Sequence, residues 1–400
     1  MNARSLLSDR ATAMDSSGIR RVFELGATLK DPVNLSIGQP DFPVPDALKN
    51  AAIEAVATDL NGYSLNQGLP ELVVRTTEYL EHDVGWTCGP PADPSSPTAL
   101  ITAGTSGALV LSFMSLLSAG DEVIIPDPYF VSYPELATMC GAKAVRCDCY
   151  PDFKMTAERV APLITERTKA VLYCSPSNPA GVALTEWECA DLLELCRSKG
   201  VLLIADEIYD EFAFDEARTQ PAIGDAGSGS GDLRCPSPAR LPGAADSVLL
   251  IRGFGKTYGC TGWRLGYCAG PADIVGAMVK IQQYTFVCAP TPLQAGVLAA
   301  FDTDMGPTVQ AYADRRDMIM ETLGALTEVA RPDGAFYAFV KIPEHLGMTG
   351  TQFFERCVEE NVLVIPGGVF SERDTHIRLS FATKPDRLAE GLEKIAGLMR

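Results

Sequence analysis

The chain has 400 residues, of which 51 are acidic and 33 are basic, so its net charge is -18 at pH 7. A chain of this length can bury a large core, and we expect it to form two or three domains. The negative charge repels phosphate backbones and anionic lipid head groups, so we expect neither a nucleic-acid partner nor a membrane partner.

Motifs for export, membrane insertion and metal binding are absent from the sequence. The first ten residues contain no apolar signal core, and no apolar run reaches the roughly 18 residues of a membrane-spanning helix. We therefore expect a cytoplasmic protein. The 12 cysteines form no C-x-x-C pair and are expected to be buried, reduced thiols. The 3 histidines lack neighbours at metal-ligand spacing, so no metal site is expected.

Short apolar runs alternate with helix-length patterns between about residues 99 and 270. This alternation predicts an α/β fold with a mostly parallel central sheet and helices on both faces. The candidate strands are residues 99–102, 123–125, 170–173, 201–205 and 248–251. In such sheets ligands bind beyond the carboxyl ends of the strands, so chemistry is expected in the loops that follow them.

A glycine-rich turn at residues 103–109 follows the first of these strands and leads into an apolar helix candidate at 109–117. Backbone N–H groups at the start of a helix bind phosphate well, so Gly104, Thr105 and Ser106 form a candidate phosphate site. An ordinary connecting turn is the alternative interpretation.

Two later strands end in polar residues that suit a heterocyclic cofactor. The S-P-S-N-P-A-G turn after residues 170–173 presents Asn178, whose amide can donate to a phenolate oxygen. Asp206 ends the next strand and can pair with a protonated ring nitrogen. Tyr209, three residues later, can also donate to a phenolate oxygen. A salt bridge or helix cap for Asp206 and core packing for Tyr209 are the alternatives.

Residues 224–245 are rich in Gly, Ser, Pro and Ala, which predicts a mobile surface loop. After the next strand comes Lys256 in R-G-F-G-K-T-Y-G, where the glycines let a flat ligand approach an amine suited to imine formation. A phosphate-binding P-loop would need a glycine where Leu250 stands, which excludes that motif. An ordinary exposed lysine is the alternative.

Arginines complete the candidate site. Arg264 lies eight residues beyond Lys256 and can return to the same phosphate. From about residue 331 the pattern changes to mixed strands and helices, which predicts a smaller α+β domain. Strand candidates lie at 334–340, 362–365 and 376–381, before a terminal helix with Leu388, Leu392, Ile395 and Leu398 on one face. Arg378 projects from the last strand, and its guanidinium can hold a carboxylate by two parallel hydrogen bonds.

Together these motifs resemble the fold-type I aminotransferases of class I/II, subclass I, which include the aspartate, alanine and aromatic transaminases. The resemblance spans nearly the whole chain, with seven motifs in family order. They are N-L-S-I-G-Q-P-D-F-P-V-P from Asn34, Y-S-L-N-Q-G-L-P-E-L from Tyr63, P-Y-F-V-S-Y-P from Pro128, S-P-S-N-P-A-G from Ser175, A-D-E-I-Y-D from Ala205, G-K-T-Y-G-C-T-G-W-R-L-G-Y from Gly255 and H-I-R-L-S-F-A from His376.

The resemblance implies pyridoxal 5'-phosphate as the cofactor and a catalytic set of Lys256, Asp206 and Tyr209. Lys256 matches the Schiff-base lysine that shuttles the proton, and Asp206 matches the ring-nitrogen partner. Asn178 and Tyr209 match the partners of the phenolate oxygen, and Phe130 matches the ring stacked on the cofactor.

Further positions follow from the same resemblance. Gly104, Thr105, Ser106 and Arg264 are expected to hold the cofactor phosphate. Gly38, Asn178 and Arg378 are expected to bind the substrate carboxylate. Tyr63 matches a tyrosine that reaches the phosphate of the neighbouring subunit, which implies a homodimer with shared active sites. The implied domains are residues 45–290, the large cofactor-binding domain, and 291–400, the small domain, which segment 1–44 joins.

Two departures from the family pattern stand out. Many relatives carry a phosphate-binding serine where this chain has Gly253. The separation between Asp206 and Lys256 is also longer than the pattern suggests, which fits an insertion at residues 224–245.

The expected reaction moves an amino group from an L-amino acid to a 2-oxo acid, with 2-oxoglutarate as acceptor, by a ping-pong mechanism like that of aspartate aminotransferase. The amino donor stays open, and Arg20 is a candidate for binding a distal carboxylate. A carbon-sulfur β-lyase of the same fold is the nearest alternative, because it uses the same α-carbanion. A ligand-sensing regulator is the other alternative, although the chain has no appended helix-turn-helix or basic segment.

Overall fold

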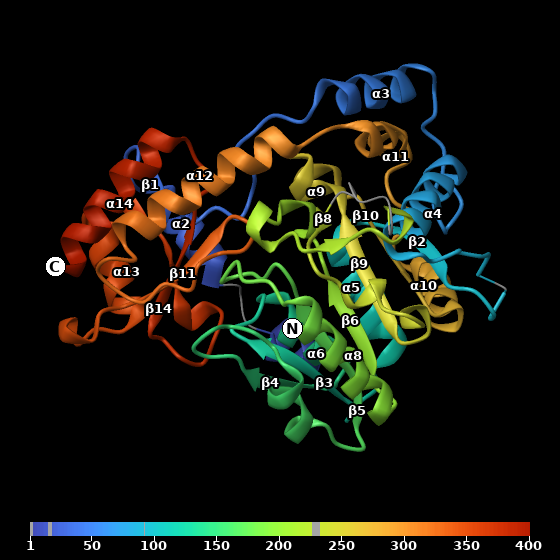
Figure 1. Ribbon diagram of the computed structural model, residues 1–400, viewed down its shortest axis with the longest axis horizontal. Coiled ribbons are helices and arrows are strands. Elements are labelled where there is room, and N and C mark those ends of the chain that lie inside the picture. Colours follow the sequence, from blue (N-terminus) through green and yellow to red (C-terminus); the bar gives the residue numbers. More distant parts are fainter. Residues whose placement is uncertain (1–2, 15–17, 92, 226–232) are drawn as a thin grey trace.

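A seven-stranded sheet forms the centre of the larger part of the protein (Figure 1), in a computed structural model that describes residues 3–14, 18–91, 93–225 and 233–400. Its strand order is β2-β10-β9-β6-β5-β3-β4, and neighbours are parallel except that β10 runs antiparallel to β2 and β9. The strands are β2 (Thr98–Thr102), β3 (Glu122–Asp127), β4 (Lys143–Asp148), β5 (Thr168–Cys174), β6 (Leu202–Asp206), β9 (Val248–Gly253) and β10 (Gly266–Gly270). The predicted mostly parallel α/β sheet is confirmed.

Helices cover both faces of this sheet. Helices α5 (Gly104–Leu116), α6 (Ser132–Met139) and α10 (Ala272–Tyr284) pack against one face. Helices α4 (Pro70–Val84) and α8 (Glu186–Lys199) pack against the other. Because both faces are buried, the central strands are mostly apolar, and the charged residues Asp206 and Arg252 stand near the carboxyl ends of β6 and β9.

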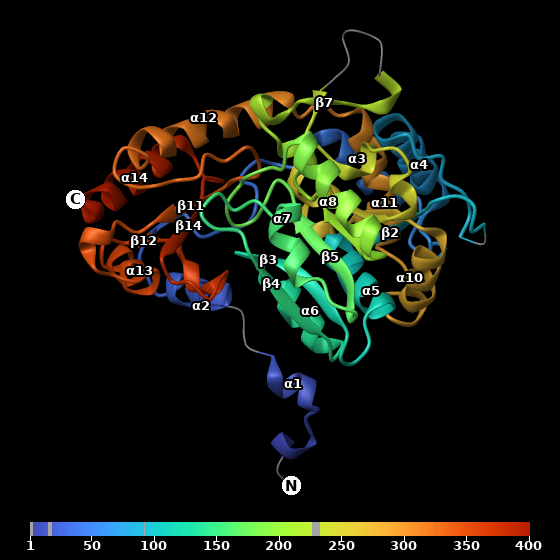
Figure 2. The same ribbon diagram turned by 60° about the horizontal axis from the view of Figure 1, so that its bottom comes forward.

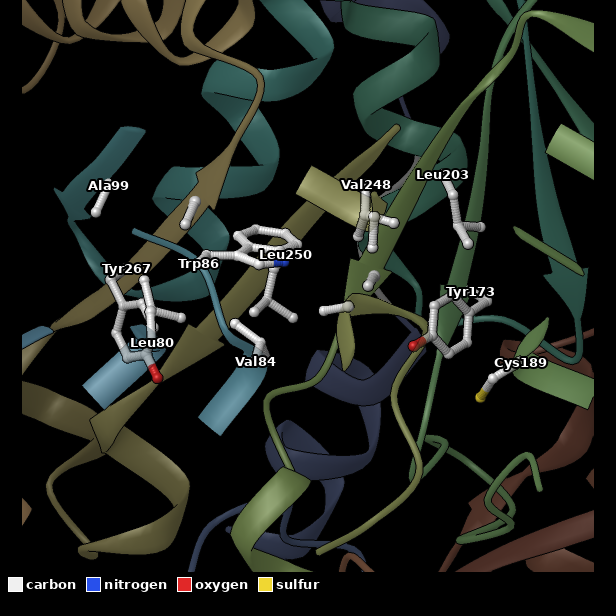
Figure 3. Close-up of a cluster of buried hydrophobic side chains, with 14 of the residues drawn as sticks. Leu80, Val84, Trp86, Ala99, Tyr173, Cys189, Leu203, Val248, Leu250 and Tyr267 are labelled. Carbon is white, nitrogen blue, oxygen red and sulfur yellow. The ribbon is translucent and has the colours of Figure 1, made fainter. Parts of the chain in front are cut away.

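The alternation of side chains along β6 shows how the two faces form. Leu203 and Ala205 belong to the core beneath α4 and α8, where Leu203 lies in the layer that also holds Tyr173 and Leu250 (Figure 3). Ile204, between them, belongs to the core beneath α5, α6 and α10. The last two side chains of the strand, those of Ala205 and Asp206, therefore also point to opposite faces of the sheet.

A second, smaller sheet lies beside the first and is surrounded by the C-terminal helices (Figure 1). It has the antiparallel order β11-β14-β13, and a separate pair, β1 with β12, joins the N-terminal segment to the C-terminal part of the chain. The strands are β1 (Val33–Asn34), β11 (Tyr337–Lys341), β12 (Val362–Leu363), β13 (Ile365–Pro366) and β14 (His376–Ser380). The helices around them are α2 (Gly18–Gly26), α12 (Gly306–Thr322), α13 (Gly350–Glu359) and α14 (Pro385–Met399).

The remaining elements are short or peripheral. Helix α1 (Asp9–Ala13) extends away from the body of the protein (Figure 2). The others are α3 (Asp46–Ala57), α7 (Ala157–Val160), α9 (Phe254–Thr257), α11 (Thr291–Gly296), β7 (Gln220–Pro221), β8 (Leu233–Arg234) and the 3-10 helices η1 (Ala3–Leu6), η2 (Ala161–Leu163), η3 (Asp210–Phe212), η4 (Asp215–Ala217), η5 (Ile223–Asp225), η6 (Pro238–Arg240), η7 (Ala244–Asp246), η8 (Thr261–Trp263), η9 (Val297–Asp302), η10 (Glu344–Leu346) and η11 (Gly367–Val369). Among the described residues, no helix is both long and apolar enough to cross a bilayer.

Three expectations are corrected by the structure. The single strand expected at residues 362–365 is split into β12 and β13. Strands β4 and β10 were not predicted, because the edge strand β4 carries charged side chains and β10 begins and ends with glycine.

The third correction concerns the expected surface loop at residues 224–245. Residues 235–240 are buried, and η6 and η7 follow β8 within this stretch. The glycine-rich stretch 227–231 lies outside the described residues. A surface loop is therefore wrong for residues 235–240.

Candidate active site

A cavity of about 390 Å³ opens where β5, β6 and β9 end, and residues of the smaller sheet complete its lining. The structure brings to this cavity every site residue predicted from the sequence except Tyr63 and the distal-carboxylate candidate Arg20. These residues are Gly38, Gly104, Thr105, Ser106, Phe130, Asn178, Asp206, Tyr209, Lys256, Arg264 and Arg378.

Asp206 ends β6 and presents a buried carboxylate to the cavity. Its Oδ2 accepts a hydrogen bond of 2.7 Å from the Tyr133 hydroxyl, whereas its buried Oδ1 has no protein partner. Burial raises the pKa of the Asp206 carboxyl to about 6, against the lowering effect of the Tyr133 hydrogen bond. A buried acceptor without a partner is costly, and a cationic N–H would satisfy it and keep Asp206 ionised. The structure thus leaves this oxygen for a ligand.

Lys256 lies in α9, which begins directly after β9. Its ammonium nitrogen donates to the carbonyl oxygen of Gly38, in the N-terminal segment. Burial lowers the pKa of Lys256, and the positive charges of Arg378 and Arg264 act in the same direction, against the effect of Tyr337. A lysine with a lowered pKa supplies neutral amine, the form that can attack a carbonyl or take a proton, more readily than an exposed lysine.

Arg378 projects from β14 and is buried at the boundary between the two sheets. Its Nη1 donates to Asn178 Oδ1 at 3.2 Å, its Nη2 donates to the Ser36 carbonyl at 2.8 Å, and its buried Nε has no partner. The guanidinium carbon lies 4.5 Å from the centre of the Tyr337 ring. A fixed, buried guanidinium with free donor capacity suits a carboxylate ligand.

The phenol of Tyr209 lines the same cavity, near Tyr337 and Lys256. Its hydroxyl lies 3.1 Å from that of Tyr337, and Lys256 Nζ lies 5.9 Å from the centre of the Tyr209 ring. Burial raises the pKa of Tyr209 well above its usual value, so the hydroxyl keeps its proton and can donate it in a hydrogen bond. The cavity therefore has a neutral donor next to its cations.

The phosphate site predicted at residues 104–106 forms the start of α5. A Cβ atom on Gly104 would lie 2.8 Å from Arg264 Nη2, so the glycine lets the guanidinium approach the helix start. Unpaired N–H groups of a first helical turn and an adjacent arginine favour an anion. Thr105 and Ser106 add hydroxyl groups to this end of the cavity.

Gly253, where the resemblance leads us to expect a serine, lies in a crowded place. A Cβ atom there would lie 3.0 Å from Thr105 Cγ2 and 2.9 Å from Ile208 Cδ1. The space that a serine side chain would need is therefore occupied by these two residues.

Two predicted residues lie outside the cavity. Tyr63 is 87% exposed and does not line it. The Arg20 side chain is 78% exposed and pairs with Glu24 at 3.3 Å, while its neighbour Ile19 lines the cavity. The position of Arg20 gives no support to a role in binding a distal carboxylate.

Tyr133 is a site residue that the sequence analysis missed. It lines the cavity and bonds to Asp206, and its ring packs edge-on against Phe130 at a centroid distance of 5.6 Å. The signal was present in the P-Y-F-V-S-Y-P motif, of which only Phe130 had been assigned a role.

The mostly parallel sheet, with an amine, a carboxylate and a helix start at its carboxyl edge, defines a fold-type I α/β transferase. The family model "Aminotransferase class I and II" matches residues 30–395. The chain therefore belongs to this family and is a pyridoxal-phosphate-dependent aminotransferase, with amino acids and 2-oxo acids as its substrates.

Relatives and solved structures agree with this assignment. A "Probable aspartate aminotransferase" of Methanocaldococcus jannaschii is 34% identical over 99% of this chain and 99% of its own length. An aspartate aminotransferase of Pyrococcus abyssi is 31% identical over 98% of each chain. The structure of Thermus thermophilus aspartate aminotransferase with maleate has a TM-score of 0.87 and 31% identity, covering 98% of this chain and 99% of that one.

Proposed function

We propose that the protein transfers the amino group of an L-amino acid, with aspartate as the first donor to test, to 2-oxoglutarate by a ping-pong mechanism. The observation that carries this proposal is that Lys256, the unpartnered oxygen of Asp206 and the guanidinium of Arg378 all face one cavity. The aspartate aminotransferase names of several relatives support the choice of donor.

Pyridoxal 5'-phosphate fits the polar groups of the cavity. Asp206 Oδ1 would pair with the ring nitrogen and Lys256 would hold the aldehyde carbon. When bound, the cofactor accepts the electron pair that the substrate α-carbon releases. The donors of Asn178 and Tyr209 would bind the phenolate oxygen, and the ring of Phe130 would stack on the cofactor. The phosphate would lie at Gly104, Thr105, Ser106 and Arg264.

Arg378 orients the substrate in this proposal. Its guanidinium binds the α-carboxylate, while Asn178 and the Ser36 carbonyl hold it in one direction through the contacts described above. A carboxylate anchored at one end leaves the α-hydrogen of the substrate directed toward Lys256. Gly38, whose carbonyl accepts from Lys256, lies beside the same carboxylate site.

Lys256 moves the proton. As a neutral amine it takes the proton from the α-carbon of the substrate. It would then return this proton to the other carbon atom that is bonded to the transferred nitrogen. The amino acid and the 2-oxo acid share the α-carboxylate, so both would use Arg378 and bind in turn. Alternate binding at one site gives the parallel double-reciprocal plots that initial-rate measurements with both substrates would show for a ping-pong mechanism.

A homodimer is part of the proposal. Tyr63 and Leu65, 87% and 66% exposed, would meet a second copy, with Tyr63 reaching the phosphate bound by its partner. Sedimentation of the holoenzyme measures this, and a monomer with full activity would contradict it.

We also propose that residues 45–290 and 291–400, with segment 1–44, act as two domains that close on the substrate. Arg378 lies on the smaller sheet and Lys256 follows the larger one, so a bound carboxylate would draw the two together. Crystals with and without a dicarboxylate inhibitor would show the closure, and identical domain positions would contradict it.

Replacement of Lys256 by Ala tests the central role. We expect Lys256→Ala to lower the turnover number by at least about 10⁴-fold, because a proton-transfer group of this kind contributes roughly 10² to 10⁴ and covalent attachment is lost as well. Borohydride should fix the cofactor to the wild-type chain and not to the variant. The control is Lys199→Ala, an exposed lysine at the end of α8.

The assay that follows both products separates the alternatives. Amino-group transfer requires the 2-oxo acid acceptor, whereas a β-lyase releases ammonia and pyruvate without one. Acceptor-independent ammonia release, or full activity of Lys256→Ala, would refute the proposal.

A further inference from the structure

A buried ionic network lies behind the candidate active site, on the side of the sheet edge that faces away from the cavity. It contains Glu207, Arg252, Asp83 and Arg240, whose side chains are 0 to 2% exposed. The charges alternate along the series Glu207, Arg252, Asp83, Arg240. Asp210 adds a third carboxylate, whose Oδ2 lies 3.0 Å from Arg252 Nε. None of these residues lines the cavity that holds Asp206 and Lys256.

The pair of Glu207 and Arg252 joins the two strands that carry the candidate catalytic residues. Arg252 donates to Glu207 Oε2 through Nε at 3.1 Å and Nη2 at 2.9 Å, and its Nη1 donates to Asp83 Oδ2 at 2.6 Å. Glu207 directly follows Asp206, and Arg252 precedes Lys256 by four residues. The backbone already joins these strand ends, since Asp206 pairs with Ile251 and the Glu207 N–H donates to the Ile251 carbonyl at 2.9 Å. The two-point side-chain contact adds a second connection, which fixes the direction of the Glu207 and Arg252 side chains.

The segment that the sequence analysis expected to be a surface loop completes the network. Ser237 donates its hydroxyl to Glu207 Oε1 at 2.6 Å. Arg240 donates from Nη2 to both oxygens of Asp83, at 2.8 and 3.1 Å, and from Nη1 to the Cys235 carbonyl at 2.6 Å. The Ser237 hydroxyl and the Arg240 guanidinium reach the network on the side of the sheet away from the cavity, and residues 235–240 are buried there.

Stability alone is a weak reason for such an arrangement. The attraction between buried ions only roughly offsets the loss of their hydration, and well-packed apolar side chains often serve a core as well or better. Removing one partner, in contrast, leaves an uncompensated charge. What a fully bonded network adds is a defined position for each of its members.

We infer that Glu207 is a positioning residue for Asp206 and Lys256, and that Ser237 and Arg240 of the 235–240 segment hold it in place. The inference rests on the proposed roles of Asp206 and Lys256. Through Glu207, the 235–240 segment, which is remote from the cavity, sets the geometry of Asp206 and Lys256.

A hydroxyl deletion tests this with little risk to folding. Ser237→Ala removes the hydrogen bond to Glu207 Oε1, where Tyr173 remains as a donor, and also the bond that Ser237 Oγ accepts from the Ala239 N–H. We expect a roughly 10-fold lower turnover number, the size of one bond to a charged acceptor. The Michaelis constants should not change, because Arg378 is untouched, and the pH at which the absorbance of the bound cofactor changes should shift. Ser237→Thr, which keeps the hydroxyl, should restore both values.

The controls make the outcome decisive. Ser198→Ala removes an exposed hydroxyl that donates to the Leu195 carbonyl within α8, and it should match the wild type. A Ser237→Ala enzyme with wild-type turnover and wild-type absorbance titration would overturn the inference, as would an effect confined to thermal stability. Glu207→Gln, where it folds, should show a larger change of the same kind. An inactive wild type would instead count against the proposed function.

Discussion

Asp206 and Glu207 are consecutive acidic residues whose side chains lie on the two sides of one sheet edge. Their carboxylates differ in how many hydrogen-bond partners the protein gives them. On the cavity side, Asp206 Oδ1 is buried without a partner, and the same holds for Arg378 Nε. On the far side, Glu207 Oε1 accepts from Tyr173 and Ser237, and its Oε2 accepts twice from Arg252. Both residues are buried, so burial does not distinguish them.

The difference lies in the hydrogen-bond partners. Nearly all buried polar groups in folded proteins are bonded, so two unbonded ones that face the same cavity indicate groups that a ligand satisfies. A fully bonded carboxylate has no capacity left for a ligand and serves as support. The comparison predicts that changes on the cavity side alter chemistry and binding, whereas changes elsewhere alter geometry or stability.

The largest expected effect follows from Asp206→Asn. An amide of the same size can still bond to Tyr133, but it lacks the charge that stabilises a cationic ring, and loss of one such electrostatic contact costs roughly 10²- to 10³-fold in turnover. Steady-state transamination rates measure it. Asp191→Asn, at an exposed position on α8, is the matched control. Turnover within twofold of the wild type would mean that the unpartnered oxygen has no catalytic role.

A smaller effect is expected for Arg378→Lys. Lysine keeps the positive charge but cannot make two parallel bonds to a carboxylate, so we expect the Michaelis constants of both substrates to rise by roughly 10- to 100-fold. Rates measured at varied concentrations of the amino acid and of the oxo acid would show it. The control is Arg356→Lys, whose side chain is 49% exposed on α13. A rise for only one substrate would contradict the shared carboxylate site.

The residues predicted from the sequence gather at the cavity, whereas the supporting network was not predicted, and the difference has a physical reason. Lys256, Asp206 and Asn178 stand in local motifs directly after apolar strands, so short stretches of sequence indicate both their place and their chemistry. The partners of the network are distant along the chain, and Asp83 and Arg240 are 157 positions apart.

The composition of residues 235–240 also misled the prediction. Small residues and prolines are typical of exposed loops, but they are equally suited to a buried irregular segment that packs closely. Strand β10 shows the same ambiguity, because its glycines resemble a loop until β2 and β9 are known to flank it. Local composition cannot distinguish these cases, since burial depends on what packs against the segment.

The smallest expected effect concerns His376, a buried group on β14 whose charged neighbours, Lys341 and Arg373, are both positive. Its ring stacks on Phe339 at a centroid distance of 4.7 Å, and burial lowers its pKa to about 4. The folded pKa is below the usual value of about 6.5. The stability that depends on neutral His376 is therefore fully present above pH 6.5, and the free energy of unfolding decreases as the pH falls toward 4.

Substitution of His376 by Phe should remove this pH dependence. The loss for the wild type is about 2.5 kcal/mol by pH 4.5, from the linkage between the two pKa values. Urea unfolding of wild type and His376→Phe at pH 7 and pH 4.5 measures the difference, with His345→Phe at an exposed position on η10 as the control. Equal losses for wild type and His376→Phe would mean that the buried ring accepts its proton without cost. A smaller loss for His376→Phe would show that a buried titratable group without an opposite charge costs stability, which the paired carboxylate of Glu207 avoids.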